Sequence, residues 1–331
     1  MDTRDPSALL HGPQRRIMRF ACALLLFRTT LFAAEAAKLP RRSARERIQY
    51  LRQARIWEPI DVASENLYDG PHRDLKRAMD QDVTCDFYPK PMGGFTEKFF
   101  CRLDDGRILK VKYDDGPQYK EAVSEVLGTR KNQGWSWRSL KHVDPNAGGA
   151  TRAEIDALKL LNAFVQNSDN KAKQNALACP RDAIETSDGG NAICRRPILY
   201  VDDLGAVFGR GGFLTGYAGR ADYEGWKRVP VWRNTATCTA RLTSIGGIFR
   251  TSTLSNPKIG EAGRALLAAQ LAQLSDAQIA DLFRAARIET LHQTLSDGGS
   301  GRREVNVDDW VALFKAKRDE ITMHAPCGEV P

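Results

Sequence analysis

Four polar residues that follow a predicted helix have the types and spacing that phosphoryl transfer requires. Apolar residues at helical spacing over 154–165 are followed by Asp169, Lys171, Gln174 and Asn175. A carboxylate can orient an attacking hydroxyl, a lysine can neutralise the moving phosphoryl group, and an amide oxygen can bind magnesium. The sequence therefore predicts a catalytic loop directly after this helix.

A second pair of acids follows a predicted buried strand. The apolar run over 198–201 ends at Asp202 and Asp203, with Gly205 two residues on. Phosphoryl transfer needs such a further carboxylate to hold a metal ion. An acid at a helix end and a turn after a strand would give the same local pattern, so an unrelated fold stays open.

The elements that position these residues can be predicted from local signals. Thr151 and Glu154 form a capping box that starts the helix, and its apolar stripe predicts a buried position. Toward the C-terminus we expect further helices over 259–274, 276–291 and 307–321. Near the N-terminus, residues 41–55 predict a short exposed helix against the main body.

Three strand-like runs precede the helix-rich part, over residues 83–88, 95–103 and 107–113. The Asp105-Gly106 pair between the last two is a hairpin signal. We therefore expect a small antiparallel sheet.

The third run places Lys110 and Lys112 on one face of a strand, and a predicted helix over 119–130 follows with Glu121 and Glu125. A strand lysine paired with a helix glutamate can bind nucleotide phosphates. Surface lysines and solvated glutamates would give the same pattern, so both interpretations remain open.

The first 37 residues predict a cleaved signal peptide. Arginines at 15, 16 and 19 precede an apolar run over 20–27, and small residues over 33–37 suit a signal peptidase. An amphipathic helix or a membrane anchor is the alternative. We expect an exported protein, periplasmic or secreted, with no membrane span in the mature chain.

Six cysteines remain after the signal, an even number that suits disulfides in an exported protein. We expect Cys85 to pair with Cys101 and Cys179 with Cys194, because each pair closes a short loop. No CxxC or HxxxH pattern is present, so we expect no zinc site. The net charge of +8 comes without a long basic run, so we expect no nucleic-acid partner.

The order of these motifs resembles the protein-kinase-like fold. The chain most resembles a group of exported bacterial proteins distantly related to HipA-like and phosphatidylinositol-kinase-like enzymes. The resemblance extends from about residue 83 to 208, with helices beyond, and depends on the segments 109–113, 125–130, 169–171 and 203–208.

The resemblance implies a role for each matching residue. Asp169 would be the catalytic-loop aspartate and Lys171 the loop lysine, while Asp203 would hold magnesium and Asp202 would shape the site. The loop amide that binds magnesium usually stands five positions after the aspartate, which is Gln174 here. Asn175 follows it, so either amide is a candidate metal ligand.

The resemblance also implies a nucleotide site. Lys112, or Lys110 in its place, would bind phosphates and pair with Glu125. Gly93 and Gly94 would cover the nucleotide phosphates, although no GxGxxG is present. ATP and magnesium are the implied ligands, with an unknown hydroxyl-bearing acceptor as partner.

The expected fold is α+β and two-lobed, with a small antiparallel sheet lobe and a mostly helical lobe. Only about twenty residues separate Arg130 from Thr151, so the region that would receive adenine is shortened. The expected divisions are a signal peptide (1–37), an N-terminal extension (38–81), a small β-rich lobe (82–131) and a helical lobe (132–331).

Three functions fit these observations. The first is an exported phosphotransferase that uses ATP and magnesium. The second is a catalytically dead, kinase-like binding module, which the shortened region favours. The third is an unrelated disulfide-bonded exported protein. A hydrolase with paired carboxylates lacks sugar-binding aromatics near the acids, and no GxSxG is present.

Overall fold

The structure is a computed structural model in which the chain forms two compact units, each described here by itself. The first unit contains the described residues 84–127, and the second contains 43–68 and everything from residue 130 onward. The predicted signal peptide, residues 1–37, lies outside the described residues. The structure describes residues 43–57, 60–68, 84–89, 98–112, 123–127, 130–131, 135–179, 183–186, 192–201, 207–209, 221–242, 254–296 and 301–328.

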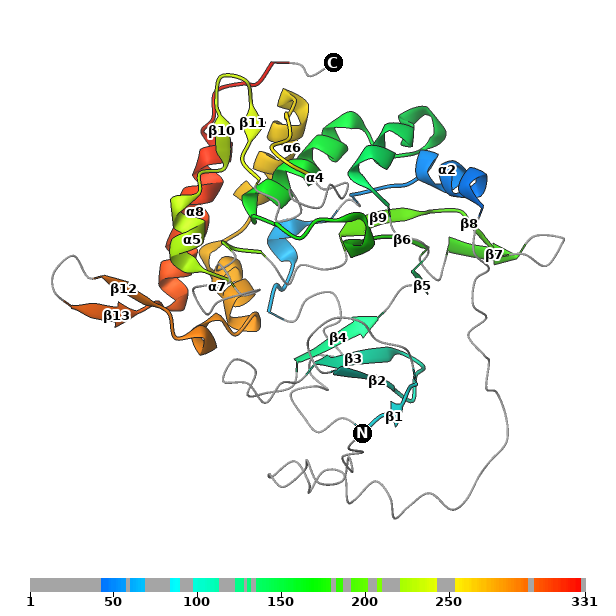
Figure 1. Ribbon diagram of the computed structural model, residues 1–331, viewed down its shortest axis with the longest axis horizontal. Helices are drawn as coiled ribbons and strands as arrows, with labels where there is room; N and C mark the ends of the chain where they lie inside the picture. The colour runs from blue at the N-terminus through cyan, green and yellow to red at the C-terminus, as the bar shows by residue number, and fades with distance from the viewer. Residues whose placement is uncertain are drawn as a thin grey trace, which may run out of the picture. The chain divides into compact units, whose positions relative to one another are not determined.

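The first unit is built on a four-stranded antiparallel sheet with the strand order β1-β2-β3-β4 (Figure 1). The three strands expected from the sequence are confirmed, and a fourth is added. The strands are β1 (Asp86–Phe87), β2 (Lys98–Arg102), β3 (Ile108–Lys112) and β4 (Val123–Leu127).

A hairpin and a disulfide hold this sheet together. Gly106 has φ +81° in the turn between β2 and β3, a conformation that glycine adopts without steric cost. Cys101 lies opposite Leu109, and both side chains are buried in the small core of this unit. The predicted disulfide between Cys85 and Cys101 is present and links β2 to the residue that precedes β1.

β4 corrects one expectation, because the segment over 119–130 that we predicted as a helix contains a strand. Its valines favour the extended conformation. A third strand without a neighbour would also leave a row of backbone groups unpaired, and β4 supplies their partners. The long-range pairing therefore outweighs the local helical pattern.

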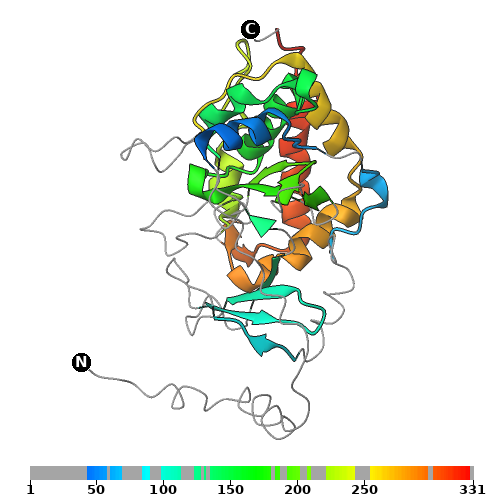
Figure 2. The same ribbon diagram turned by 90° about the vertical axis from the view of Figure 1, so that its right-hand side faces the viewer.

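The second unit is rich in helices, and the helices predicted in its N-terminal, middle and C-terminal parts are confirmed (Figures 1 and 2). Side-chain caps start most of them, including Thr151 before α4, Ser275 before α7 and Asn306 before α8. The helices are α2 (Ala44–Arg52), α4 (Arg152–Phe164), α5 (Tyr223–Arg228), α6 (Glu261–Ala272), α7 (Asp276–Ala285) and α8 (Val307–Thr322).

Helices α4 and α6 approach closely through a glycine. A Cβ atom at Gly263 would lie 2.5 Å from the Cβ of Asp156, so no larger residue fits there without a shift. Asp156 is buried, but it pairs with Arg152 and Lys159 and accepts a hydrogen bond from the backbone N–H of Gly260 at the start of α6. Its charge is thus compensated, partly by the positive end of α6.

An aromatic cluster fills the core where α4, α5, α7 and α8 meet. Its rings contact one another mostly edge to face, the arrangement that the ring quadrupoles favour. The aromatic cluster consists of Phe164, Phe208, Trp226, Phe283, Trp310 and Phe314.

The second unit also contains a three-stranded antiparallel sheet with the order β5-β6-β9, in which β5 precedes α4 in the sequence and the other two strands follow it. Its strands are β5 (Arg130–Lys131), β6 (Asn175–Cys179) and β9 (Ile198–Val201).

Two disulfides lie in the second unit. The predicted disulfide between Cys179 and Cys194 is present, and a further disulfide joins Cys238 to Cys327. Shorter hairpins are β7 (Ile184–Thr186) with β8 (Ala192–Cys194), β10 (Trp232–Asn234) with β11 (Thr239–Ala240), and β12 (Thr294–Ser296) with β13 (Arg302–Glu304).

The N-terminal segment packs against the same sheet. α2 is the helix predicted over 41–55; its Leu51 is buried, and Ile48 stays exposed. After the helix, Arg55 forms a parallel bridge with Ile198, where its backbone exchanges hydrogen bonds with Pro197 and Leu199 of the β9 segment. None of the helices in the described part of the chain is long and apolar enough to cross a membrane.

Candidate catalytic loop

The loop between α4 and β6 contains most of the predicted catalytic residues. It begins with a sharp turn in which Gln166 has φ +55°, and its side-chain amide donates to the carbonyls of Ala163 and Arg241. The backbone N–H of Asn167 then donates to the carbonyl of Asn162 at 2.8 Å. These bonds fix the direction in which the chain leaves α4.

Asp169 contacts two of the residues that were predicted to act with it. Lys171 Nζ lies 2.5 Å from Asp169 Oδ1, and Gln174 Nε2 donates to Asp169 Oδ2 at 3.1 Å. The side chain of Asp169 is 34% exposed and that of Lys171 28% exposed, so a substrate can reach both. The structure therefore brings an acid, a lysine and an amide together.

Asn170 is a positioning residue that the sequence did not reveal. It is fully buried, and its Nδ2 donates to the carbonyls of Asn167 and Leu254. Its Oδ1 accepts from the backbone N–H of Leu254 at 2.6 Å, and its own carbonyl accepts from Trp137 Nε1 at 2.8 Å. Asn170 thus holds the backbone next to Asp169 in place through its contacts with Leu254 and Trp137.

Replacing Asn170 with alanine is expected to lower the free energy of unfolding by about 2 to 3 kcal/mol, because the buried backbone groups of Leu254 lose their partners. Urea denaturation measures this loss. Asn66→Ala is the matched control, since the bond that Asn66 accepts from Tyr68 N–H is exposed at the surface. Equal losses in the two variants would contradict the role assigned to Asn170.

Asn175 begins β6 and is buried. Its Nδ2 donates to the carbonyl of Trp135 at 3.1 Å, and a carbonyl can only accept, so this contact fixes the orientation of the amide. Its Oδ1 is buried and has no hydrogen-bond partner within the described part of the chain. An acceptor oxygen left in this state needs an explanation, and a bound cation is one.

Strand β9 ends beside Asn175. Asn175 is the Cα partner of Val201, the last residue of β9, and Trp135 Nε1 donates to carbonyls of both strands, at Ala176 and Tyr200. Asp202 and Asp203 follow Val201 in the sequence but lie outside the described residues.

Residues 207–209, which follow the two acids in the sequence, are held in place by contacts with α4 and α5. The backbone N–H of Phe208 donates to the carbonyl of Val165 at the end of α4, and its ring lies in the aromatic cluster. Gly209 has φ +71°, and a Cβ there would lie 2.1 Å from the backbone nitrogen of Trp226. Only glycine fits this position.

The predicted nucleotide-binding residues belong to the first unit. Lys110 and Lys112 lie on β3, and Glu125 lies on β4, where its Cα partner is Lys110, whereas Lys112 lies opposite Val123. This register favours Lys110 over Lys112 as the neighbour of Glu125. Gly93 and Gly94 lie outside the described residues.

No protein-family model, curated protein or solved structure matches the chain. Its function must therefore be inferred from the loop. The residues that sequence reasoning missed there are Trp135, Trp137 and Asn170, whose partners are 33 to 84 positions away in the sequence. Their only signal in the sequence is the presence of two tryptophans in an otherwise polar segment.

Proposed function

We propose that the protein is an exported phosphotransferase with a kinase-like fold that uses ATP and magnesium. The observation on which this rests is the loop itself. It holds Asp169 against Lys171, and it ends at Asn175, whose orphaned oxygen lies on the strand that pairs with the strand leading to Asp203.

The order of elements supports the proposal. Helix α4, the loop, β6 and β9 occur in this order, with the β7–β8 hairpin between the two strands, and β6 and β9 pair antiparallel before Asp203 in the sequence. A catalytic loop with an acid and an amide, together with a further metal-binding acid, is the set of parts that protein kinases use. The α+β composition of the chain fits the same fold.

Asp169 is the residue that orients the acceptor. Its carboxylate accepts a hydrogen bond from the acceptor hydroxyl, whose oxygen attacks the γ-phosphorus of ATP. A bond forms between these atoms, the bond from the γ-phosphorus to the bridging oxygen breaks, ADP leaves, and the hydroxyl proton passes to Asp169. Lys171 lies beside this carboxylate, so its ammonium group can offset the charge of the phosphoryl group.

The amide that fits a metal site best is that of Asn175. Its Nδ2 is held by the carbonyl of Trp135, and its Oδ1, the atom that would bind a metal, is buried with no described hydrogen-bond partner. An amide oxygen and a carboxylate are the hard ligands that magnesium prefers, so Asn175 and Asp203 would hold it. When bound, magnesium neutralises charge on the nucleotide phosphates.

The predicted phosphate-binding residues remain those of β3 and β4. Lys110, in preference to Lys112, would bind phosphates and pair with Glu125, as the register of β3 and β4 favours. Gly93 and Gly94 stay predicted phosphate-covering residues. The acceptor is proposed only as a hydroxyl-bearing molecule.

A second candidate function is a kinase-like binding module without activity. β5 pairs directly with β6, with Arg130 opposite Cys179, and two 3₁₀ turns over 137–142 and 145–147 then lead to α4. Among the described residues between 130 and 151, no further strand provides the hinge backbone that adenine needs. This observation favours loss of nucleotide binding.

A thermal-shift titration separates the two functions. Oxidised protein comprising residues 38–331 is titrated with ATP, with and without magnesium, beside the variant Asp203→Ala. A ligand that binds only the native state raises the melting temperature, so the proposal expects a magnesium-dependent rise that Asp203→Ala abolishes. Asp61→Ala, which removes an exposed carboxylate elsewhere, should keep the rise.

Asp169→Asn completes the test. This variant should keep the magnesium-dependent rise in melting temperature but should lose ATP turnover, measured as ADP release, by a factor of about a hundred or more. No rise in the native protein at millimolar ATP would rule out the enzyme and leave the binding module.

A further inference from the structure

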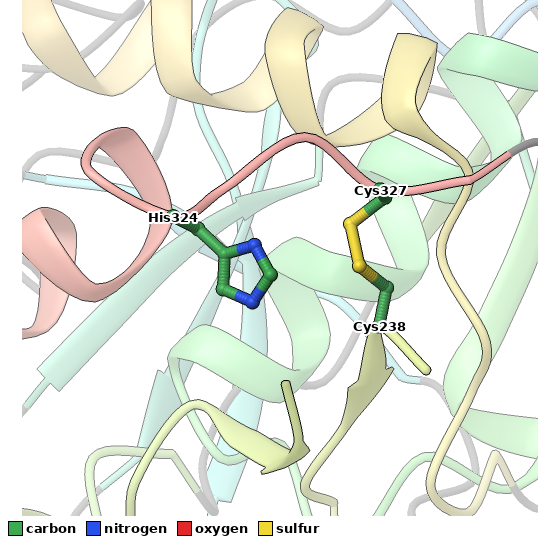
Figure 3. A group of neighbouring side chains, drawn as sticks. All are labelled: Cys238, His324 and Cys327. Carbon is green, nitrogen blue, oxygen red and sulfur yellow. A yellow bond between two sulfur atoms is a disulfide. The ribbon is translucent and has the colours of Figure 1, made fainter. Parts of the chain in front are cut away.

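The disulfide between Cys238 and Cys327 has a histidine beside it. His324 follows α8 and precedes Cys327 by three residues, and Figure 3 shows the edge of its ring that bears both nitrogens facing the two sulfurs. One atom from each of the three residues lies within 4.8 Å of the others. These are the ligand types of a zinc site, in an H-x-x-C arrangement completed by a cysteine far away in the sequence.

The tautomer of His324 suits metal binding. Its Nδ1 lies at hydrogen-bond distance from the carbonyl of Ala325, and a carbonyl can only accept, so Nδ1 carries the proton. Nε2 of the neutral ring is therefore unprotonated. It is buried and has no hydrogen-bond partner within the described part of the chain. A histidine that donates one ring N–H to a carbonyl and offers the other nitrogen is typical of zinc sites.

The histidine ring is held in place by its surroundings. The ring of Trp232 packs against it with centroids 4.5 Å apart. Trp232 is itself fixed, because its Nε1 donates to the carbonyl of Glu320 near the end of α8. The position of Nε2 is therefore set before any metal arrives.

The backbone of each cysteine is held in place by a hydrogen bond. The N–H of Cys327 donates to Glu261 Oε2 at 2.7 Å, and Arg264 keeps that carboxylate in place by donating to both of its oxygens. The carbonyl of Cys238 accepts from the N–H of Ile259 at 3.0 Å. These contacts involve no sulfur, so they do not depend on the disulfide.

The spacing suits a metal once the sulfurs separate. Two thiolates around a tetrahedral zinc lie about 3.8 Å apart, as the zinc–sulfur distance of about 2.3 Å requires. The two Cα atoms are 5.8 Å apart, which lets side-chain rotation alone open the sulfurs to that distance.

We propose that reduction of the Cys238–Cys327 disulfide creates a zinc site formed by Cys238, Cys327 and His324. A dithiol reductant supplies two electrons and two protons, so the S–S bond breaks, two thiols form, and the reductant becomes a disulfide. Zinc then displaces the two thiol protons, and water takes the fourth position. The two thiolates neutralise the charge of the ion, and the site exists only in the reduced protein.

The experiment uses residues 38–331, reduced with a phosphine that binds metals weakly and titrated with Co²⁺ as a spectroscopic substitute for zinc. We expect one equivalent to bind with a thiolate-to-cobalt charge-transfer band, and zinc to displace it. The oxidised protein should show no band. His324→Ala should weaken the affinity at least tenfold, whereas His292→Ala, which changes an exposed histidine elsewhere, should leave it unchanged.

The other four cysteines are also reduced in this experiment, so the double variant Cys238→Ser/Cys327→Ser is titrated in parallel and should lose the band. A band that survives in this variant, or an affinity that His324→Ala leaves unchanged, overturns the proposal. Circular dichroism follows the fold throughout. A reduced protein that unfolds and does not regain structure with zinc also overturns it.

Discussion

Replacing Trp226 with alanine is expected to lower the free energy of unfolding of the second unit by about 4 to 5 kcal/mol, at the upper end of the range for buried aromatic residues. The side chain is fully buried, and it stacks on Trp310 with an interplanar angle of 25°. Its removal leaves a cavity at the centre of the aromatic cluster.

The loss of a hydrogen bond destabilises this variant in addition to the cavity. Trp226 Nε1 donates to the carbonyl of Phe164 at 2.9 Å, and that carbonyl is at the last residue of α4. Alanine would leave this buried acceptor without its side-chain donor. Because Phe208 also packs on Trp226, the loss should reach the segment that follows Asp203.

Guanidinium denaturation followed by tryptophan fluorescence measures the effect. All six tryptophans of the chain lie in the second unit, so fluorescence reports on that unit alone. Trp57→Ala is the matched control, because Trp57 also donates to a backbone carbonyl, that of Glu154, but is only half-buried. A loss in Trp226→Ala no larger than in this control would contradict the central role of the aromatic cluster.

Removal of the Cys238–Cys327 disulfide is expected to cost nearly as much. The bond closes a loop of 89 residues, and the entropy that such a crosslink removes from the unfolded chain corresponds to about 4 to 5 kcal/mol. The double variant Cys238→Ser/Cys327→Ser should therefore unfold at a much lower denaturant concentration than the native protein.

The Cys179–Cys194 disulfide is the control for this prediction. It lies in the same unit but closes only 15 residues, so Cys179→Ser/Cys194→Ser should lose about 3 kcal/mol. Denaturation of the two double variants under oxidising conditions compares the two bonds. An order opposite to that of the loop lengths would show that native contacts, and not chain entropy, determine their effects.

Local signals predicted most helices of the second unit and the first three strands of the first unit. Capping residues such as Thr151 and Ser275 marked helix starts correctly, and the Asp-Gly turn placed the hairpin of the first unit. The strand at Val123–Leu127 was missed for a physical reason. Glutamates at helical spacing suggested a helix, and the competing interaction, the open edge of β3, cannot be seen in a local window.

The candidate loop was also predictable only in part, because local spacing predicts some of its contacts and distant residues determine the others. The types and spacing of Asp169, Lys171 and Gln174 were sufficient to propose their association, and the structure places the three in contact. The choice between Gln174 and Asn175 needed the backbone carbonyl of Trp135, which orients the amide of Asn175 from 40 positions away. Such partners become neighbours only when the chain folds.

The bridge between Arg55 and β9 has a consequence for self-association. β9 pairs with β6 on one side, and on the other the backbone of Arg55 occupies the groups of Pro197 and Leu199. A strand edge with unpaired N–H and C=O groups can recruit a strand from another chain. The backbone of Arg55 therefore occupies part of this strand edge, and we expect it to hinder edge-to-edge pairing with a second chain.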